Sequence, residues 1–155
     1  MTDQEYREMA MMICMDNQDA FDCLIKLKDL CRIWDDCWDC DKMVDRDDVD
    51  NVFSDIAFEL SRNEFYRKNR DALEAQIFVS WNAWQAANEW KEHPERAKRL
   101  YAWFIRDYCF EIEHLVAWLV GGKEHAKKLN LIIRDKALNQ LLAQEDREEL
   151  GYGIQ

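Results

Sequence analysis

The sequence predicts an all-α protein, a bundle of five to six helices, and three observations support this. Apolar residues recur at intervals of three and four along most of the chain, which is the period of a half-buried helix. Only 4 glycines and 1 proline occur among the 155 residues, so few positions interrupt a helix. No run of alternating Val, Ile and Thr bounded by turn residues is present, as strands would require. We therefore expect a single helical domain over residues 1–155, with a frayed tail at about 148–155.

The predicted bundle is built around an antiparallel hairpin of two long helices, at about 61–92 and 94–120. Pro94 fits the first position of a helix, where its missing N–H is not needed, and Gly121 and Gly122 provide a left-handed C-terminal cap. Apolar residues surround the second helix on nearly every side, so we expect it to lie centrally or beneath a partner. Its core-facing arc is expected to contain Tyr101, Phe104, Ile105, Tyr108, Cys109, Ile112, Leu115, Val116, Leu119 and Val120, with polar lines Asp107/Glu111/His114 and Arg106/Glu113 outside it.

The first two helices of the chain are expected before residue 41. Thr2 and Glu5 have the spacing of a capping box, so a short helix should run from Asp3 to about Cys14. Asp16 or Asn17 can then cap a second helix. The inward residues are expected to be Tyr6, Met9, Ala10 and Ile13 in the first helix, and Ala20, Cys23, Leu24, Leu27, Leu30, Cys31, Trp34 and Trp38 in the second.

The same pattern predicts a third and a last helix, and it sets the start of the fourth, which is the first arm of the hairpin. Asp47 or Asp48 can cap a third helix, the capping-box pair Ser61 and Glu64 begins a long fourth helix ending near Glu92, and a last helix covers about 124–145. The expected inward residues are Val49, Val52, Phe53, Ile56, Ala57 and Leu60 in the third, and Leu73, Ile77, Trp81 and Trp84 in the fourth, which has a second face of Ala72, Ala75, Val79, Ala83 and Ala86. In the last helix they are Leu129, Ile132, Ile133, Ala137 and Leu141, with Leu131, Leu138 and Leu142 in a second row.

The charge of the chain limits its partners. With 32 acidic against 21 basic residues the formal net charge is -11, which argues against direct binding to nucleic acid or to an anionic membrane, because both need clustered Lys and Arg. A basic protein partner fits better, although solubility alone also explains such a charge. The N-terminus lacks the basic start and apolar stretch of a secretory signal, so we expect a cytoplasmic protein with reduced cysteines.

Two short motifs could carry chemistry, and both are incomplete. Glu111 and His114 have the Glu-x-x-His spacing of di-metal helical bundles, but no second such pair is present, so a hydrogen-bonded polar line with Asp107 is the favoured explanation. Cys37 and Cys40 form a single Cys-x-x-Cys without the second ligand pair of a structural zinc site, near a helix C-terminus that disfavours thiolate. No nucleophile elbow and no glycine-rich phosphate loop occurs. We therefore expect no cofactor and no catalytic residue.

The leading functional hypothesis is a non-enzymatic protein that self-associates or binds a host or partner protein. Seven tryptophans are many for 155 residues, and Trp is enriched where proteins dock. The composition would suit a phage or mobile-element accessory factor. Two alternatives are a metal-binding bundle enzyme or sensor at Glu111/His114, and an acidic DNA mimic that inhibits a nucleic-acid-binding protein. The candidate partner residues are Trp103, Phe110 and Trp118, or Trp84 and Trp90, and for the DNA mimic Trp38, Asp45, Asp47 and Asp48.

Overall fold

The structure, a computed structural model, describes the chain over residues 3–40 and 43–148. These residues form six α-helices and no strand: α1 (Asp3–Cys14), α2 (Gln18–Asp39), α3 (Arg46–Ser54), α4 (Glu64–Trp90), α5 (Arg96–Arg106) and α6 (Phe110–Glu148). The predicted all-α bundle is therefore confirmed. The proposed N-terminal cap at Thr2 and the tail beyond residue 148 lie outside the described residues.

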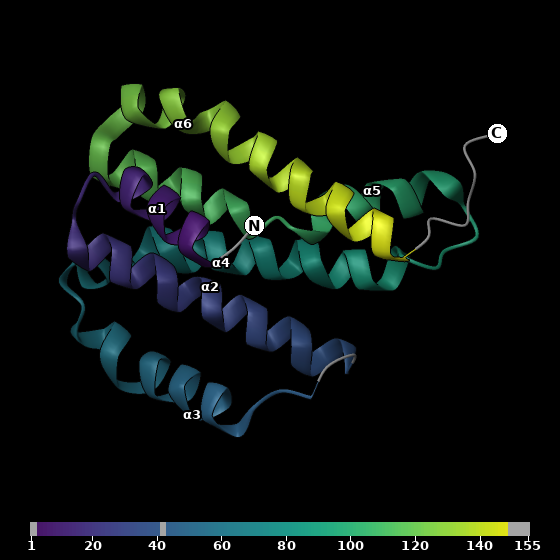
Figure 1. The fold of residues 1–155 in the computed structure, drawn as a ribbon, viewed down its shortest axis with the longest axis horizontal. Helices are drawn as coiled ribbons and strands as arrows, with labels where there is room; N and C mark the ends of the chain where they lie inside the picture. Colours follow the sequence, from purple (N-terminus) through teal and green to yellow (C-terminus); the bar gives the residue numbers. More distant parts are fainter. Residues whose placement is uncertain (1–2, 41–42, 149–155) are drawn as a thin grey trace.

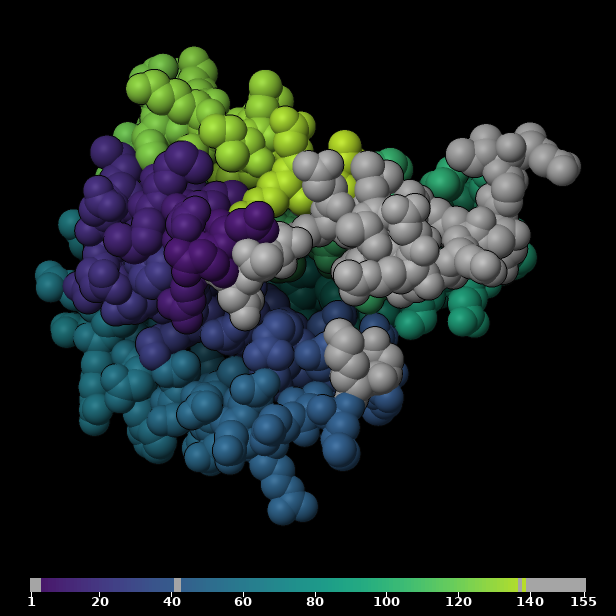
Figure 2. Space-filling model, viewed as in Figure 1, coloured from purple at the N-terminus to yellow at the C-terminus, as the bar shows by residue number. Residues whose placement is uncertain are grey.

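The helices pack as a bundle in which α2 and α4 run parallel, side by side (Figure 1). At their starts, the side-chain amide of Asn63 donates to the carbonyl of Asp19 at 2.8 Å, and at their ends Lys91 Nζ lies 3.5 Å from the Asp39 carboxylate. The helix α1 lies across α2 and α6 at the front of the molecule, as the space-filling view also shows (Figure 2). The helix α5 turns back along α4, and α3 packs on the outer side of α2 (Figure 1).

The core is formed by α1, the first half of α2, α4 and α6. All four inward residues predicted for α1 are buried, as are Ala20, Cys23, Leu24 and Leu27 of α2. The largest fully buried side chains include Ile13, Leu24, Leu27, Leu73, Val116 and Ile133. Gly122 interrupts α6 with a φ of 71°, so the predicted helix end at the glycine pair is confirmed and the second half of α6 turns back over the core (Figure 1). No helix in the described ranges is both long and apolar enough to cross a membrane.

One predicted cap offers a direct test of how α2 begins. The Asn17 side-chain oxygen accepts the amide N–H of Ala20 at 3.0 Å. We expect Asn17→Ala to lower the free energy of unfolding by about 1 kcal/mol, because that amide loses its partner. Urea denaturation followed by circular dichroism measures the loss, and Asn17→Asp serves as the matched control that keeps the acceptor. An unchanged stability in the alanine variant would contradict the role assigned to this cap.

Two other helix starts differ from the prediction. The cap of α3 is Asp45, whose carboxylate accepts the amide N–H of Asp47 at 3.0 Å, so neither Asp47 nor Asp48 is the cap. The cap of α4 is Asn63, which accepts the amide N–H of Tyr66 at 2.8 Å. The cap of α3 lies two residues before the expected Asp47, and the cap of α4 lies two residues after the expected Ser61.

The predicted helix over 94–120 is divided into α5 and the first half of α6. Its N-cap is Glu95, so Pro94 lies in the turn before the helix. The helix stops at Arg106, and the hydroxyl of Ser80 on α4 donates to the carbonyl of Tyr108 in the break at 3.1 Å. That carbonyl also accepts the amide N–H of Glu111 at 3.1 Å. No glycine or proline marks this break. The predicted hairpin is therefore present, but its second arm is interrupted at residues 107–109.

Several residues predicted to face the core are instead exposed. Tyr101 and Phe104 of α5 and Tyr108 in the break face solvent, and so do Val49 and Phe53 of α3. At the end of the predicted α2 stripe, Trp34 and Trp38 lie beyond the part of the helix that α1 and α6 cover. The exposed members of the predicted inward sets are Trp34, Trp38, Val49, Phe53, Ile56, Ala57, Ala75, Val79, Trp81, Tyr101, Phe104, Tyr108 and Ile132.

Candidate protein-binding surface

A cluster of aromatic rings lies where the second half of α2 meets α4. The rings of Trp34 and Trp38, one helical turn apart on α2, are stacked with centroids 6.4 Å apart. Both contact the ring of Trp84 on α4 edge-on, at 6.2 and 5.4 Å. Trp84 is buried, so a core residue fixes the position of two rings that remain open to solvent.

Carboxylates on α2 anchor this cluster to α4 and α5. The indole N–H of Trp84 donates to the Asp35 carboxylate at 2.8 Å. The guanidinium of Arg106 lies 3.8 Å from Asp35 and 3.4 Å from Asp39, and Lys91 lies 3.5 Å from Asp39. These carboxylates therefore join the end of α2 to α4 and α5 beside the aromatic cluster.

A second pair of exposed aromatic rings lies on α4. The rings of Phe78 and Trp81 are 6.2 Å apart, and Trp81 lies one turn before Trp84 on the same helix. Phe78 is 60% exposed, and Trp34, Trp38 and Trp81 are between 43% and 53% exposed. We call Trp34, Trp38, Phe78 and Trp81 the tryptophan face.

The partner residues named from the sequence do not form one surface. Trp118 is exposed, whereas Trp103 and Phe110 are half-buried, and no ring contact joins the three in the described part of the chain. Trp84 is buried, so it supports the tryptophan face from beneath and is not open to a partner. Trp90 is half-buried against Tyr101, and the ammonium of Lys98 lies 5.7 Å from its ring centroid.

The acidic residues named from the sequence divide into paired and open carboxylates. The Asp48 carboxylate lies 3.3 Å from Arg32 Nη2, and Asp45 caps α3. Asp47 is exposed, and no ion pair is found for it among the described residues. Part of the predicted acidic cluster therefore has a structural role, and Asp47 remains open to solvent.

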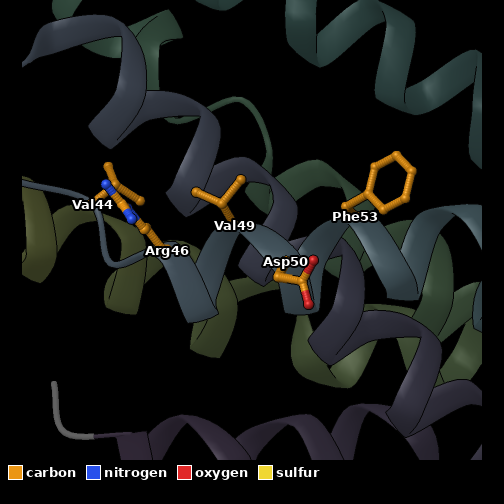
Figure 3. Close-up of a pocket in the computed structure, with 5 residues that line it drawn as sticks. All are labelled: Val44, Arg46, Val49, Asp50 and Phe53. Atoms are coloured by element: carbon orange, nitrogen blue, oxygen red, sulfur yellow. The ribbon is translucent and has the colours of Figure 1, made fainter.

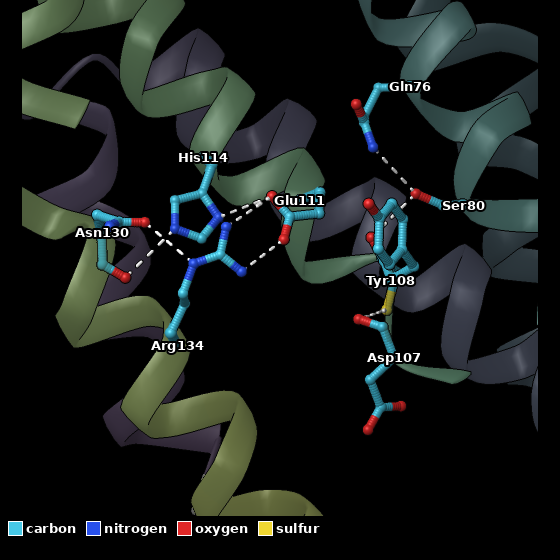
Figure 4. Close-up of polar contacts among 9 residues, drawn as sticks. Gln76, Ser80, Asp107, Tyr108, Glu111, His114, Asn130 and Arg134 are labelled. Carbon is cyan, nitrogen blue, oxygen red and sulfur yellow. Dashed lines mark hydrogen bonds and ion pairs between the residues drawn. The ribbon is translucent and has the colours of Figure 1, made fainter. Parts of the chain in front are cut away.

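The Glu-x-x-His pair faces an arginine across the two halves of α6 (Figure 4). The Glu111 carboxylate accepts two hydrogen bonds from the guanidinium of Arg134, at 2.8 and 3.4 Å. His114 Nδ1 lies 3.4 Å from Glu111 Oε2 but is not aligned for a hydrogen bond, and its Nε2 lies 3.4 Å from the carbonyl of Asn130. No group of three possible metal-binding side chains occurs in the described residues. The cation opposite Glu111 is a guanidinium of the chain itself.

The Cys-x-x-Cys pair lies at the end of α2, as the sequence indicated. Cys40 is the C-cap in a left-handed conformation, with φ 53°, and its thiol donates to the Cys37 carbonyl at 3.4 Å. Both thiols are exposed, and no third ligand lies near them in the described ranges.

One ionisable residue of the core, Glu113, was not predicted to lie there. The helical period places it on an outer polar line, but the side chain is only 4% exposed and its Oε2 has no hydrogen-bond partner. Burial raises the pKa of Glu113 to about 7, while a hydrogen bond from Tyr6 and the charges of Lys136 and Lys28 oppose the rise. Glu113 lies three residues before the buried Val116, and this spacing was the signal that could have identified it.

The chain was also compared with known proteins. It matches no family model, no curated protein and no solved structure at a significant level. Its function is therefore argued from the surfaces described above.

Proposed function

We propose that this chain is a non-enzymatic protein–protein interaction module that binds a partner protein through the tryptophan face. The observation that carries the proposal is the half-exposed stack of Trp34 and Trp38 on the buried Trp84. Rings already held in one position lose little conformational entropy on binding, and tryptophans of this kind contribute strongly to interface affinity.

The exposure of these rings is the second support. Soluble monomers seldom leave a contiguous group of large aromatic side chains in water, because covering such a patch is favourable. The tryptophan face contains two pairs of contacting exposed rings, Trp34 with Trp38 on α2 and Phe78 with Trp81 on the adjacent α4. A partner that covers these rings gains the free energy of burying them. The helix α2 need not reorder, because Asp35 and Asp39 already pair with Arg106.

The charge of the chain favours a foreign partner over a second copy. Two copies each carrying a formal charge of -11 repel one another, and a basic partner is attracted. Sedimentation velocity over a wide range of concentrations separates the two cases. We expect a monomer throughout, and a concentration-dependent dimer would favour self-association.

The two alternatives from the sequence have weaker support. A metal centre would need the Glu111 carboxylate, which is engaged by Arg134. A DNA mimic would need Asp45, Asp47 and Asp48 together as open carboxylates, and Asp48 is paired with Arg32. We therefore retain the interaction module as the conclusion.

The proposal is tested by substituting the exposed rings. We expect Trp38→Ser with Trp81→Ser to weaken capture of the natural partner from native lysate at least tenfold, because hot-spot tryptophans typically contribute 2 kcal/mol or more. Trp118→Ser is the matched control, since Trp118 is also half-exposed but lies on α6. Quantitative mass spectrometry measures how much partner is captured by the parent chain, by the double variant and by the control. Equal loss in the control, or no loss in the double variant, would contradict the proposal.

A further inference from the structure

The helix α3 and the π-helical turn that follows it, Asp55–Glu59, bury none of their residues. Their apolar side chains are nevertheless large: Phe53 is 64% exposed and Phe58 is 51% exposed, and the two rings contact each other at 6.2 Å. A helix of 9 residues is marginal in water unless it packs an apolar face. This segment is therefore the least supported part of the bundle, and its apolar side is uncovered.

Polar contacts hold α3 on α2. Lys26 forms an ion pair with Asp55, and Arg32 Nη2 lies 3.3 Å from the Asp48 carboxylate. Ion pairs near the surface contribute only about 0 to 1 kcal/mol each. These contacts fix the helix in position without using its apolar residues, which remain available.

The uncovered side of α3 forms a shallow, open hollow of about 340 Å³. Val44, Val49 and Phe53 provide its apolar lining, and Arg46 and Asp50 complete it (Figure 3). Val49 and Phe53 are one turn apart, so they lie on one face of the helix, as Figure 3 shows. Such a row matches the spacing of apolar side chains on a second helix laid against it.

The charge around the hollow indicates what could cover it. Six carboxylates and one guanidinium lie between Asp45 and Glu59, a formal net charge of -5. Asp47 and Asp50 are exposed, and no ion pair is found for either within the described residues. A partner with apolar side chains for the hollow and cations for these two carboxylates would complement both properties.

We propose that α3 and the turn after it form a second contact surface, which binds a basic amphipathic helix of a partner protein. This inference rests on the proposed function, because both treat the chain as a protein-binding module. Apolar side chains of the partner would fill the hollow at Val49 and Phe53, and its Lys or Arg side chains would face Asp47 and Asp50. A second copy fits less well, because it would place a net charge of -5 against another -5.

The test uses two synthetic amphipathic helical peptides of equal length, one of Leu and Lys and one of Leu and Glu. Their binding to the full chain is measured by isothermal titration calorimetry at low and moderate salt. We expect the Lys peptide to bind, the Glu peptide not to bind, and the affinity to fall as salt is raised. Val49→Ser with Phe53→Ser should weaken the Lys peptide about tenfold, and Asp47→Asn with Asp50→Asn about threefold to tenfold at low salt.

Controls separate this surface from general attraction to an acidic protein. Asp71→Asn with Glu89→Gln removes the same charge from exposed positions on α4 and should leave the affinity within about twofold. Trp38→Ser with Trp81→Ser should also leave it unchanged. Circular dichroism establishes that each variant keeps the helical content of the parent chain.

Several results would overturn the proposal. These are no binding of the Lys peptide, equal weakening by the α3 and α4 charge variants, or loss of binding only in the tryptophan variant. If the parent chain forms a dimer and Val49→Ser with Phe53→Ser dissociates it, the hollow is covered by a second copy and not by a basic helix. Failure here leaves the capture experiment on the tryptophan face unaffected, so this inference and the proposed function can fail separately.

Discussion

Between pH 5 and pH 8 the protein is expected to lose about 2 to 3 kcal/mol of stability through a single buried carboxyl group, Glu113. Burial raises its pKa from 4.5 in the unfolded chain to about 7 in the folded protein. The folded protein therefore binds this proton more tightly than the unfolded chain does, and stability falls as the proton leaves. Below pH 4.5 the contribution is fully present, it is lost as the pH rises through 7, and above that it stays constant. The whole difference corresponds to about 3 kcal/mol.

The groups that face Glu113 come from three helices and limit the effect. Tyr6 on α1 makes a hydrogen bond with it, and burial raises the pKa of Tyr6 well above its usual value. The ammonium groups of Lys28 on α2 and Lys136 on α6 lie 4.0 and 5.1 Å from the centroid of the Tyr6 ring. Both cations favour the charged carboxylate, but desolvation is the larger influence. The thiol of Cys14 also lies near this group.

The measurement is urea denaturation at pH 5 and pH 8 of the parent chain, Glu113→Gln and Glu124→Gln. Glutamine keeps the shape and cannot ionise, so the first variant should lose less than about 1 kcal/mol between the two pH values. Glu124 is exposed, so its replacement should leave the parental pH dependence unchanged. If the free energy of unfolding fell equally between pH 5 and pH 8 in all three proteins, Glu113 would not titrate as described.

Replacing Trp84 by alanine is expected to destabilise the chain by about 3 to 5 kcal/mol and to release the tryptophan face. The side chain is buried, so its loss removes apolar contacts and leaves a cavity in the core. It also leaves the Asp35 carboxylate without the indole N–H that it accepts at 2.8 Å. Trp34 and Trp38 would then lose the ring that fixes them.

Trp84→Phe separates the two parts of this effect. Phenylalanine keeps an aromatic ring but has no N–H, so we expect a smaller loss of about 1 to 2 kcal/mol. Urea denaturation gives the free energies, and near-ultraviolet circular dichroism reports the order of the remaining tryptophans. Equal losses in the two variants, or a loss below about 1 kcal/mol for alanine, would contradict the supporting role of Trp84.

The fold was predictable wherever local signals and the helical period agree. In α1 and the first half of α2, the spacing of apolar residues and the cap at Asn17 were sufficient, because those faces meet the core directly. The break between α5 and α6 was not predictable, because no glycine or proline marks it and the contact made there, Ser80 of α4 with the Tyr108 carbonyl, joins residues far apart in the sequence. The period of a sequence shows that a face is apolar, but not whether another helix reaches it.

The candidate surface was predictable only in part for the same reason. Trp38 was named from the sequence as an apolar anchor, but its contact with Trp84 depends on α2 lying beside α4. Trp84 was named as a partner residue and is buried instead. Glu113 was assigned to the surface, because charged residues are seldom buried without a partner.

Site-specific photo-cross-linking at position 38 in native cells tests most directly whether the tryptophan face contacts a partner. Trp38 would be replaced by a photoreactive aromatic residue, with exposed Lys68 on α4 as the control position. We expect a cross-link to a foreign protein at position 38 that is absent at position 68. Equal yields at the two positions, or a cross-link only to a second copy of this chain, would contradict the assignment of this face to a foreign partner.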